Sequence, residues 1–275
     1  MHDFLRRVCD EARDRVDAAR RVHPVESLRD TAAARVPAPS FAGGLAAPGV
    51  GVIAEIKRAS PSRGPLAPIP DAAETASRYA GGGAAAISVL TEPDHFRGSL
   101  DDLDAVTARV DVPVLRKDFL VDAYQVAEAA AFGAAAVLLI TAALGDEELA
   151  GLLTATWEAG LDALVEVTRV DEAQRAATAH RDAGGAGQLI LGINARDLRT
   201  LAVDPARFAD VRPSVPAGAL TVAESGIRGA DDVARVARLG ADAVLVGESV
   251  ATADDPTAAV GALVAAGRTT AGARP

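Results

Sequence analysis

The sequence predicts a closed (β/α)8 barrel, and three of its features lead to this fold class. The chain has 275 residues, a length at which barrels of this kind commonly form one domain. Hydrophobic residues make up 49% of the chain but aromatic residues only 3%, so the core must consist mainly of Ala, Val, Leu and Ile. Eight short apolar runs alternate with Ala-rich helical segments. The second-best fold is an open doubly wound sheet, but no GxGxxG fingerprint follows the first run.

The eight predicted strands are almost continuously apolar, which is typical of parallel strands buried on both faces. Successive strand ends are 23 to 33 residues apart, which leaves room for a crossover helix in every connection. Several helices are expected to end at the glycine of a Gly-Ala pair just before the next strand, because glycine tolerates the left-handed conformation of a helix cap. The predicted strands are 51–57, 85–90, 112–117, 135–140, 162–167, 189–194, 220–225 and 243–248.

We expect one domain over residues 1–275, with a helical extension and linker at 1–48 and the barrel at 49–267. The linker at 22–49 contains four prolines and is too short to bury a core of its own, so it is interpreted as an ordered crossing. Residues 267–275 are predicted to be frayed. The extension begins as an amphipathic helix whose apolar side is formed by Leu5, Val8, Ala12, Val16 and Ala19.

Charge and hydropathy exclude several functional classes. The net charge of −10 and the pI of about 4.9 argue against binding to nucleic acid or to an anionic membrane surface. No apolar run approaches the roughly 18 residues that a membrane span needs. The first residues lack the apolar core of a signal peptide. A cytoplasmic location is therefore expected.

Cysteine and histidine contribute little predicted chemistry. Cys9 is the only cysteine, which excludes an intramolecular disulfide and a multi-cysteine metal site, and its neighbours indicate helix packing. Of the histidines, only His95 falls in a loop that reaches the predicted mouth, and such a residue is most often polar surface. No spacing of His, Cys and carboxylates is typical of a metal site. Lysine and glutamate must therefore supply acid and base.

Charged side chains stand at the carboxyl ends of five predicted strands. Glu55 and Lys57 are two residues apart, so they point to the same side of the first strand. In a parallel barrel all strand ends converge on the face that holds the active site. One such charge would usually be a solvated rim residue, but charges at five strand ends predict a site where pKa values shift. The other strand ends supply Lys117, Glu166, Asn194, Arg196, Glu224 and Ser225.

Two glycine-containing loops predict a phosphate site. Ser225 and Gly226 follow the seventh strand, and Gly247, Glu248 and Ser249 close the eighth. The loops after strands seven and eight bind phosphate in many barrels of this architecture, and backbone N–H groups at helix starts favour anions. The alternative is that both are ordinary βα turns. A small phosphorylated substrate is expected.

Motifs from about Phe41 to Ala251 resemble those of the indole-3-glycerol phosphate synthase family in order and spacing. They include VIAEIKRASPSRG, ISVLTEPDHFRGSLDDL, PVLRKDFLVDAYQV, LGINARDLRTLAVD and VAESGIR. The combination of EIKRxSPS with LRKDF is highly specific. The resemblance implies a lyase of tryptophan biosynthesis that converts 1-(2-carboxyphenylamino)-1-deoxyribulose 5-phosphate into indole-3-glycerol phosphate, releasing CO2 and water. It implies no cofactor and no metal.

The resemblance also implies roles for the charged residues. Lys117 is the implied general acid at the substrate ketone, and Glu55 holds or tunes it. Glu166 is the acid or base partner, and Lys57 contacts the substrate and assists the later dehydration. Further substrate contacts are implied for Ser60, Asn194, Arg196, Glu224 and Ser225, and an apolar slot for the aromatic ring is formed by Leu90, Phe119, Leu138 and Ile140.

Two other functions stay open at this stage. Phosphoribosylanthranilate isomerase is a neighbouring phosphosugar barrel, but it would be expected to carry Cys or Asp where this chain has Lys117 and Glu166. A barrel that only binds a phosphorylated metabolite would not need opposed acid and base groups. A monomer is one of the oligomeric states that the sequence allows.

Overall fold

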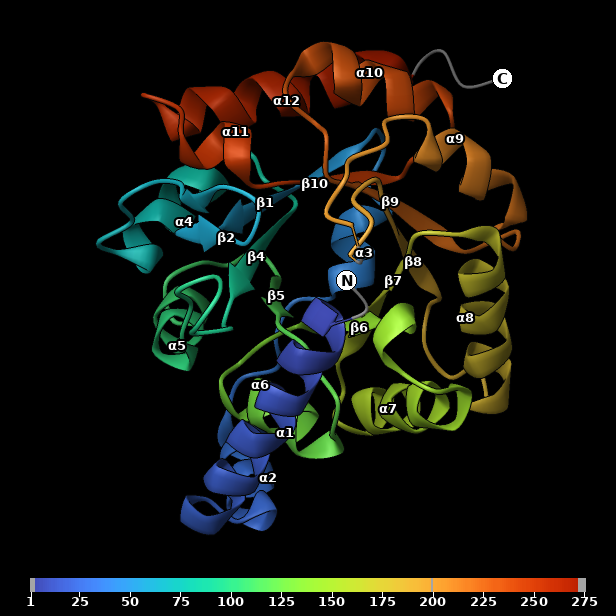
Figure 1. Ribbon diagram of the computed structural model, residues 1–275. Coiled ribbons are helices and arrows are strands. Elements are labelled where there is room, and N and C mark those ends of the chain that lie inside the picture. The colour runs from blue at the N-terminus through green and yellow to red at the C-terminus, as the bar shows by residue number, and fades with distance from the viewer. Residues whose placement is uncertain (1–2, 199, 272–275) are drawn as a thin grey trace.

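The computed structural model describes residues 3–198 and 200–271, and its centre is a closed barrel of parallel strands (Figure 1). The barrel closes in the order β1-β10-β9-β8-β7-β6-β5-β4, which confirms the predicted fold class. Within the described chain, β2 (Ala59–Ser60) and β3 (Gly64–Pro65) form a separate antiparallel hairpin after β1. The barrel strands are β1 (Gly51–Ile56), β4 (Ala86–Leu90), β5 (Val114–Lys117), β6 (Ala136–Ile140), β7 (Asp162–Val167), β8 (Ile190–Asn194), β9 (Leu220–Glu224) and β10 (Ala243–Val246).

All eight predicted strands are present, but most are shorter than predicted by one or two residues. β1 ends at Ile56, so Lys57 follows the strand, and β10 ends at Val246, so Gly247 and Glu248 lie beyond it. A residue pattern does not show where strand pairing stops, because the chain can stay extended for a residue or two beyond the last paired position. The errors therefore concern strand boundaries and leave the order of elements unchanged.

Helices surround the strands as an outer layer, and the buried apolar residues form three clusters. One fills the space between strands and helices, a second fills the inside of the barrel around Ile53, Leu115, Leu164 and Val222, and a small third one joins Val16 and Leu28 to Tyr124. The glycine caps are confirmed, since the glycines at 83, 133 and 240 have positive φ. The helices of this layer are α4 (Ala72–Gly81), α5 (Leu100–Thr107), α6 (Ala123–Ala131), α7 (Asp146–Glu158), α8 (Val170–Asp182), α9 (Arg207–Val211), α10 (Ala230–Arg238), α11 (Glu248–Ala251) and α12 (Pro256–Ala271), with short 3-10 turns at Thr141–Ala143 and Arg212–Ser214.

The N-terminal extension contributes to both ends of the barrel. Helix α1 (Asp3–Val22) buries the predicted apolar side, with Leu5, Val8 and Ala12 joining the cluster inside the barrel near its mouth. The linker holds two helices that the sequence analysis did not predict, α2 (Val25–Ala34) and α3 (Phe41–Leu45). Helix α3 lies at the opposite end, where Ala42 N–H donates to Asp162 at the start of β7 (2.9 Å). The linker is thus an ordered crossing, as expected.

The predicted fraying of the C-terminus is wrong for residues 267–271, and residues 272–275 lie outside the described chain. Helix α12 continues to Ala271 because it packs against the barrel: Val50 N–H donates to the carbonyl of Gly267 (3.3 Å), and Gly267 is buried. No helix in the described chain is long and apolar enough to cross a membrane.

Candidate active site

Inside the barrel, the side chains change from apolar to charged toward the carboxyl ends of the strands. Positions two apart in a strand share a face, so Ile53 is followed on the inside of β1 by Glu55 and Lys57, and Val222 on β9 is followed by Glu224. The polar side chains that meet at the mouth in this way are Glu55, Lys57, Lys117, Glu166, Asn194 and Glu224.

The two lysines and two of the glutamates form a continuous chain of ion pairs. Lys57 Nζ lies 2.6 Å from Glu55 Oε1, and the other carboxylate oxygen of Glu55 lies 3.3 Å from Lys117 Nζ. Lys117 Nζ also donates to Glu224 Oε2 at 3.0 Å. The carboxylates are almost fully buried, whereas the lysines keep 16% and 19% of their side chains exposed. The ammonium groups are therefore the members of this chain that a substrate can reach.

These contacts fix the charge states of Glu55 and Lys117. Burial favours the neutral form of Glu55, but the positive charges of Lys57 and Lys117 outweigh burial and lower its pKa to about 2. Burial also opposes the charged form of Lys117, yet the carboxylates of Glu224, Glu55 and Glu166 raise its pKa above the ordinary value. Lys117 is thus a protonated ammonium that carries a transferable proton at neutral pH.

Glu166 on β7 has the opposite charge state. Burial, reinforced by the negative charge of Glu224, raises its pKa to about 8, although Lys117 and the side chain of Asn194 act in the other direction. Glu166 Oε1 has no hydrogen-bond partner among the described residues. A carboxyl group with this pKa exchanges its proton near neutral pH, as acid–base catalysis requires.

Lys57 and Lys117 are also the only two lysines of the chain. All the others among its 28 lysines and arginines are arginines. A guanidinium cannot be deprotonated in a protein, whereas an ammonium can give up a proton. Lysine is therefore present only at the barrel mouth, where both ammonium groups line the cavity. This compositional signal was available in the sequence, and the sequence analysis did not use it.

A cavity above the charged cluster joins it to an apolar wall. The predicted slot residues Leu90, Phe119, Leu138 and Ile140 all line this cavity, opposite the charged groups. Sequence reasoning missed three further lining residues, Phe96, Asp118 and Leu198. Asp118 and Phe96 lie within the motifs already quoted, but nothing in their spacing indicated that they face the mouth.

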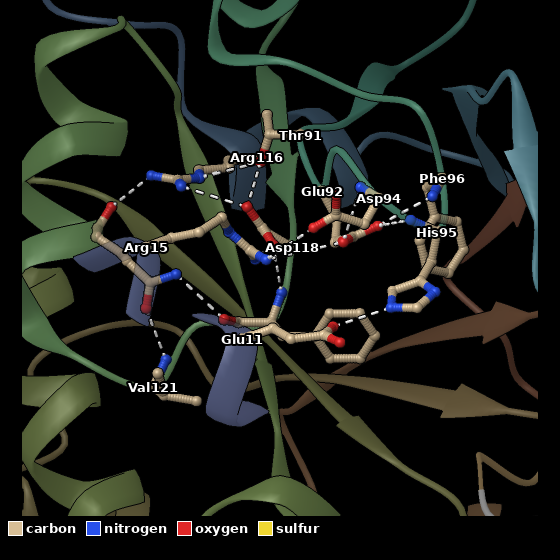
Figure 2. A network of polar contacts seen from close by, with 12 residues as sticks. Glu11, Arg15, Thr91, Glu92, Asp94, His95, Phe96, Arg116, Asp118 and Val121 are labelled. Carbon is tan, nitrogen blue, oxygen red and sulfur yellow. Dashed lines mark hydrogen bonds and ion pairs between the residues drawn. The ribbon is translucent and has the colours of Figure 1, made fainter. Parts of the chain in front are cut away.

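Helix α1 contacts the two loops that carry Phe96 and Asp118, as Figure 2 shows. Arg15 lies 3.4 Å from Asp118 Oδ1 and 3.8 Å from Glu92 Oε1. Asp118 also accepts from Thr91 Oγ1 (2.7 Å), from Arg116 (3.3 Å) and from the N–H of Phe119 (2.8 Å). Asp118 is buried and accepts hydrogen bonds at both of its oxygens, so it fixes the loop that carries Phe119 and with it this part of the apolar wall.

The loop after β4 is shaped by one buried carboxylate. Glu92 accepts hydrogen bonds from the N–H groups of Asp94 (3.1 Å), His95 (2.7 Å) and Phe96 (2.9 Å). His95 does not line the cavity; its Nε2 lies 2.9 Å from Glu11 Oε2 on α1. His95 thus connects α1 to this loop, in agreement with the expectation of a non-catalytic role.

The predicted phosphate residues occupy two neighbouring loops at the mouth. Ser225 and Gly226 both have positive φ, at 64° and 74°, and the hydroxyl of Ser249 donates to the carbonyl of Ile227 (3.4 Å), which links the two loops. The carboxylate of Glu248 pairs with Arg63 (2.6 Å), so only its backbone is available to an anion.

Of the remaining predicted residues, Arg196 and Asn194 line the cavity, whereas Ser60 does not. Arg196 lines the cavity, with its N–H donating to Asn194 Oδ1 (2.9 Å) and its guanidinium to the carbonyl of Leu201 (2.9 Å). Because Asn194 Oδ1 is occupied, its amide NH2 is turned toward Glu166. Ser60 lies in the β2–β3 hairpin, outside the cavity lining.

Known proteins resemble this chain over nearly its whole length. A family model described as indole-3-glycerol phosphate synthase matches residues 5–263. The indole-3-glycerol phosphate synthase of Mycolicibacterium smegmatis is 51% identical over 255 residues, covering 92% of this chain and 91% of that protein. The protein of the same name from Rhodococcus jostii is 49% identical over 260 residues, covering 94% of both chains.

Solved structures share the fold at low identity. The 3-hexulose-6-phosphate synthase of Salmonella typhimurium superposes with a TM-score of 0.63 at 18% identity, covering 79% of this chain and 98% of that one. Thiamine phosphate pyrophosphorylase from Pyrococcus furiosus superposes with a TM-score of 0.58 at 20% identity, covering 80% of this chain and 96% of that one. These structures support the barrel alone. The matches in sequence over nearly the whole length are what identify the chain, which belongs to the indole-3-glycerol phosphate synthase family.

Proposed function

We propose that the charged cluster at the barrel mouth carries out the chemistry of this family. The chain is a carboxy-lyase that forms indole-3-glycerol phosphate from 1-(2-carboxyphenylamino)-1-deoxyribulose 5-phosphate. One observation supports the choice of residues above all others: a protonated lysine, Lys117, and a carboxyl group of raised pKa, Glu166, interact at the edge of one cavity.

Ring closure joins the aromatic carbon that bears the carboxylate to the ketone carbon of the sugar chain. As that bond forms, the carbonyl π electrons move to the ketone oxygen, which takes the proton of Lys117 and becomes a hydroxyl. The developing oxyanion is more basic than an amine, so an ammonium of raised pKa still transfers its proton. Glu55 and Glu224 hold the ammonium in place. Loss of CO2 then returns the bonding electrons to the ring.

The second half of the reaction removes the new hydroxyl as water. An acid must protonate the leaving hydroxyl while a base takes a proton from the adjacent CH2 carbon, so the indole C2–C3 double bond forms and the ring nitrogen keeps its proton. Glu166 and Lys57 are assigned to this step: a carboxyl with a pKa of about 8 serves in either direction, and Lys57 borders the same cavity. The assignment agrees with their roles in the family resemblance.

The substrate is oriented by both ends of the site. Its aromatic ring is assigned to the apolar wall of Leu90 and Phe119. Its carboxylate is assigned to the guanidinium of Arg196, which lines the same cavity. Asn194, which lines the cavity, is assigned to a sugar hydroxyl, whereas the buried Glu224 acts on the substrate only through Lys117. The phosphate is assigned to the backbone amides of Ser225, Gly226, Gly247, Glu248 and Ser249, with Ser60 as a further contact from the β2–β3 hairpin.

A carboxylate introduced beside the phosphate should weaken substrate binding. Gly226→Asp is expected to raise KM by roughly 10- to 100-fold with a smaller effect on kcat, because like charges would be juxtaposed. Gly226→Asn is the matched control, since it has the same shape without the charge and Asn tolerates positive φ. Equal KM values for the two variants in steady-state assays would move the phosphate site elsewhere.

The proposed function is tested by adding the carboxyphenylamino-deoxyribulose phosphate to purified protein without added metal or cofactor, and following indole fluorescence. Fluorescence that appears with the wild type and is lost in Lys117→Ala supports the assignment. Substrate binding without indole formation would instead favour a barrel that only binds a phosphorylated metabolite.

We also propose that the chain acts as a monomer in the cytoplasm. The exposed large apolar residues among those described are scattered over separate elements, as expected for a surface without an apolar interface: Val22, Val36, Val170, Val203 and Leu239. Cys9 is buried and its pKa is raised to about 11, mainly by that burial, so it forms no intermolecular disulfide. Light scattering should give the mass of one chain, and twice that mass would contradict the proposal. Fractionation of native cells tests the location.

A further inference from the structure

One inward position of the barrel carries no side chain. On β8, residues 190, 192 and 194 face the inside in turn, and the middle one is Gly192. Gly192 pairs in register with Glu166 on β7, so it stands at the level of the catalytic groups. It is not among the residues of positive φ, so its backbone conformation does not require glycine. The reason for glycine must be sought in the space beside it.

That space is filled by the carboxylate of Glu224. A Cβ atom built on Gly192 would lie 1.9 Å from Glu224 Oε1 and 3.1 Å from its Cδ, while the nearest atom of Leu164 is 3.3 Å away. Real Cβ atoms do not approach other atoms to 1.9 Å, so no residue other than glycine is compatible with the observed place of this carboxylate. The other oxygen of the same group, Oε2, accepts a hydrogen bond from Lys117 Nζ at 3.0 Å.

We propose that Gly192 is a positioning residue for the reaction: the absence of a side chain at 192 provides the space from which Glu224 holds Lys117. The kinetic part of this inference rests on the proposed function. Glu224 is 1% exposed and surrounded by packed strands, so its carboxylate can move only by giving up its geometry at Lys117. The obstructing atom is the tip of a flexible side chain, and the barrel itself should therefore tolerate alanine.

The test is Gly192→Ala. It is expected to lower kcat by about 100-fold, the effect expected of a displacement of about 1 Å at a catalytic group, while far-UV circular dichroism stays that of the wild type. Gly151→Ala is the matched control: Gly151 lies in α7 with nothing within 4 Å of an added Cβ, and its turnover should be unchanged. Wild-type turnover in Gly192→Ala would overturn the inference.

A double-mutant cycle separates positioning from a structural role. In the Glu224→Ala background the carboxylate is gone, so Gly192→Ala should cost no more than about twofold in kcat, because effects that act through one shared group are not additive. An undiminished loss in that background would show that Gly192 acts through the backbone of β8 and would overturn the proposal.

A readout without substrate keeps the inference independent of the reaction. Because the chain contains only Lys57 and Lys117, protein labelled with 15N-lysine gives two side-chain ammonium signals by NMR. The Lys117 signal should shift in Gly192→Ala and in Glu224→Ala but not in Gly151→Ala. An unmoved signal in Gly192→Ala refutes the positioning role. If the Lys117 signal moves in Gly192→Ala but the wild-type protein forms no indole, the positioning role of Gly192 is upheld and the proposed function fails.

Discussion

Replacing Lys117 with methionine is expected to lower kcat by about 10²- to 10⁴-fold, the range of a lost general acid. Methionine keeps most of the volume of the side chain but carries no proton. Substrate should still bind, because the apolar wall and the phosphate loops are untouched. Steady-state kinetics gives kcat, and calorimetric titration with substrate gives the affinity.

Lys117→Arg distinguishes the proton from the charge at this position. A guanidinium keeps the positive charge between Glu55 and Glu224 but does not release a proton near neutral pH, so this variant should also be inactive. Recovery of turnover by Lys117→Arg would mean that the charge alone is needed, and the general-acid assignment would be wrong. Arg109→Met, which removes a half-exposed cation outside the barrel, controls for the loss of one positive charge.

Replacing Glu166 with glutamine should lower turnover and raise stability at the same time. The loss in kcat is again expected at about 10²- to 10⁴-fold. The folded-state pKa is raised from the ordinary 4.5 to about 8, so between these values the folded protein binds more protons than the unfolded chain. The contribution of Glu166 to the free energy of unfolding therefore falls as pH rises through this window.

Glutamine is neutral at every pH, so the variant does not show this decrease in the free energy of unfolding. The Tm of Glu166→Gln minus that of the wild type should increase from pH 4.5 to 8 and level off above about 8. Calorimetric scans across this range provide the measurement. A Tm difference independent of pH would show that Glu166 has no raised pKa, whatever happens to turnover.

Local sequence patterns were enough to predict the order of elements. Eight apolar runs with a crossover helix between each pair predict a parallel sheet covered by helices, because each strand must bury both faces, and the missing GxGxxG fingerprint favours the closed barrel over the open sheet. Alternation with a period of two also placed Glu55 and Lys57 on one side of their strand, as observed. Glycine caps were predictable, since positive φ is a property of one residue and its neighbours.

Boundaries and short helices were predicted less well. Pro24 belongs to the turn that precedes α2, where its missing N–H is no disadvantage, and this helix was not predicted from the sequence of the linker. The last residues of α12 looked frayed in isolation, but contact with Val50 orders them. In both regions packing against distant parts of the chain decides the structure.

Periodicity, spacing and motifs along the chain were enough to predict the barrel, the family and the residues at the strand ends. Which of those residues interact, and how strongly, depends on the folded structure. Lys117 and Glu224 are 107 positions apart but touch, and burial together with Glu224 gives Glu166 its pKa of about 8. The space at Gly192 is likewise set by a side chain on another strand. Distance and dielectric environment govern electrostatic and steric interactions, and neither can be read from positions along a chain.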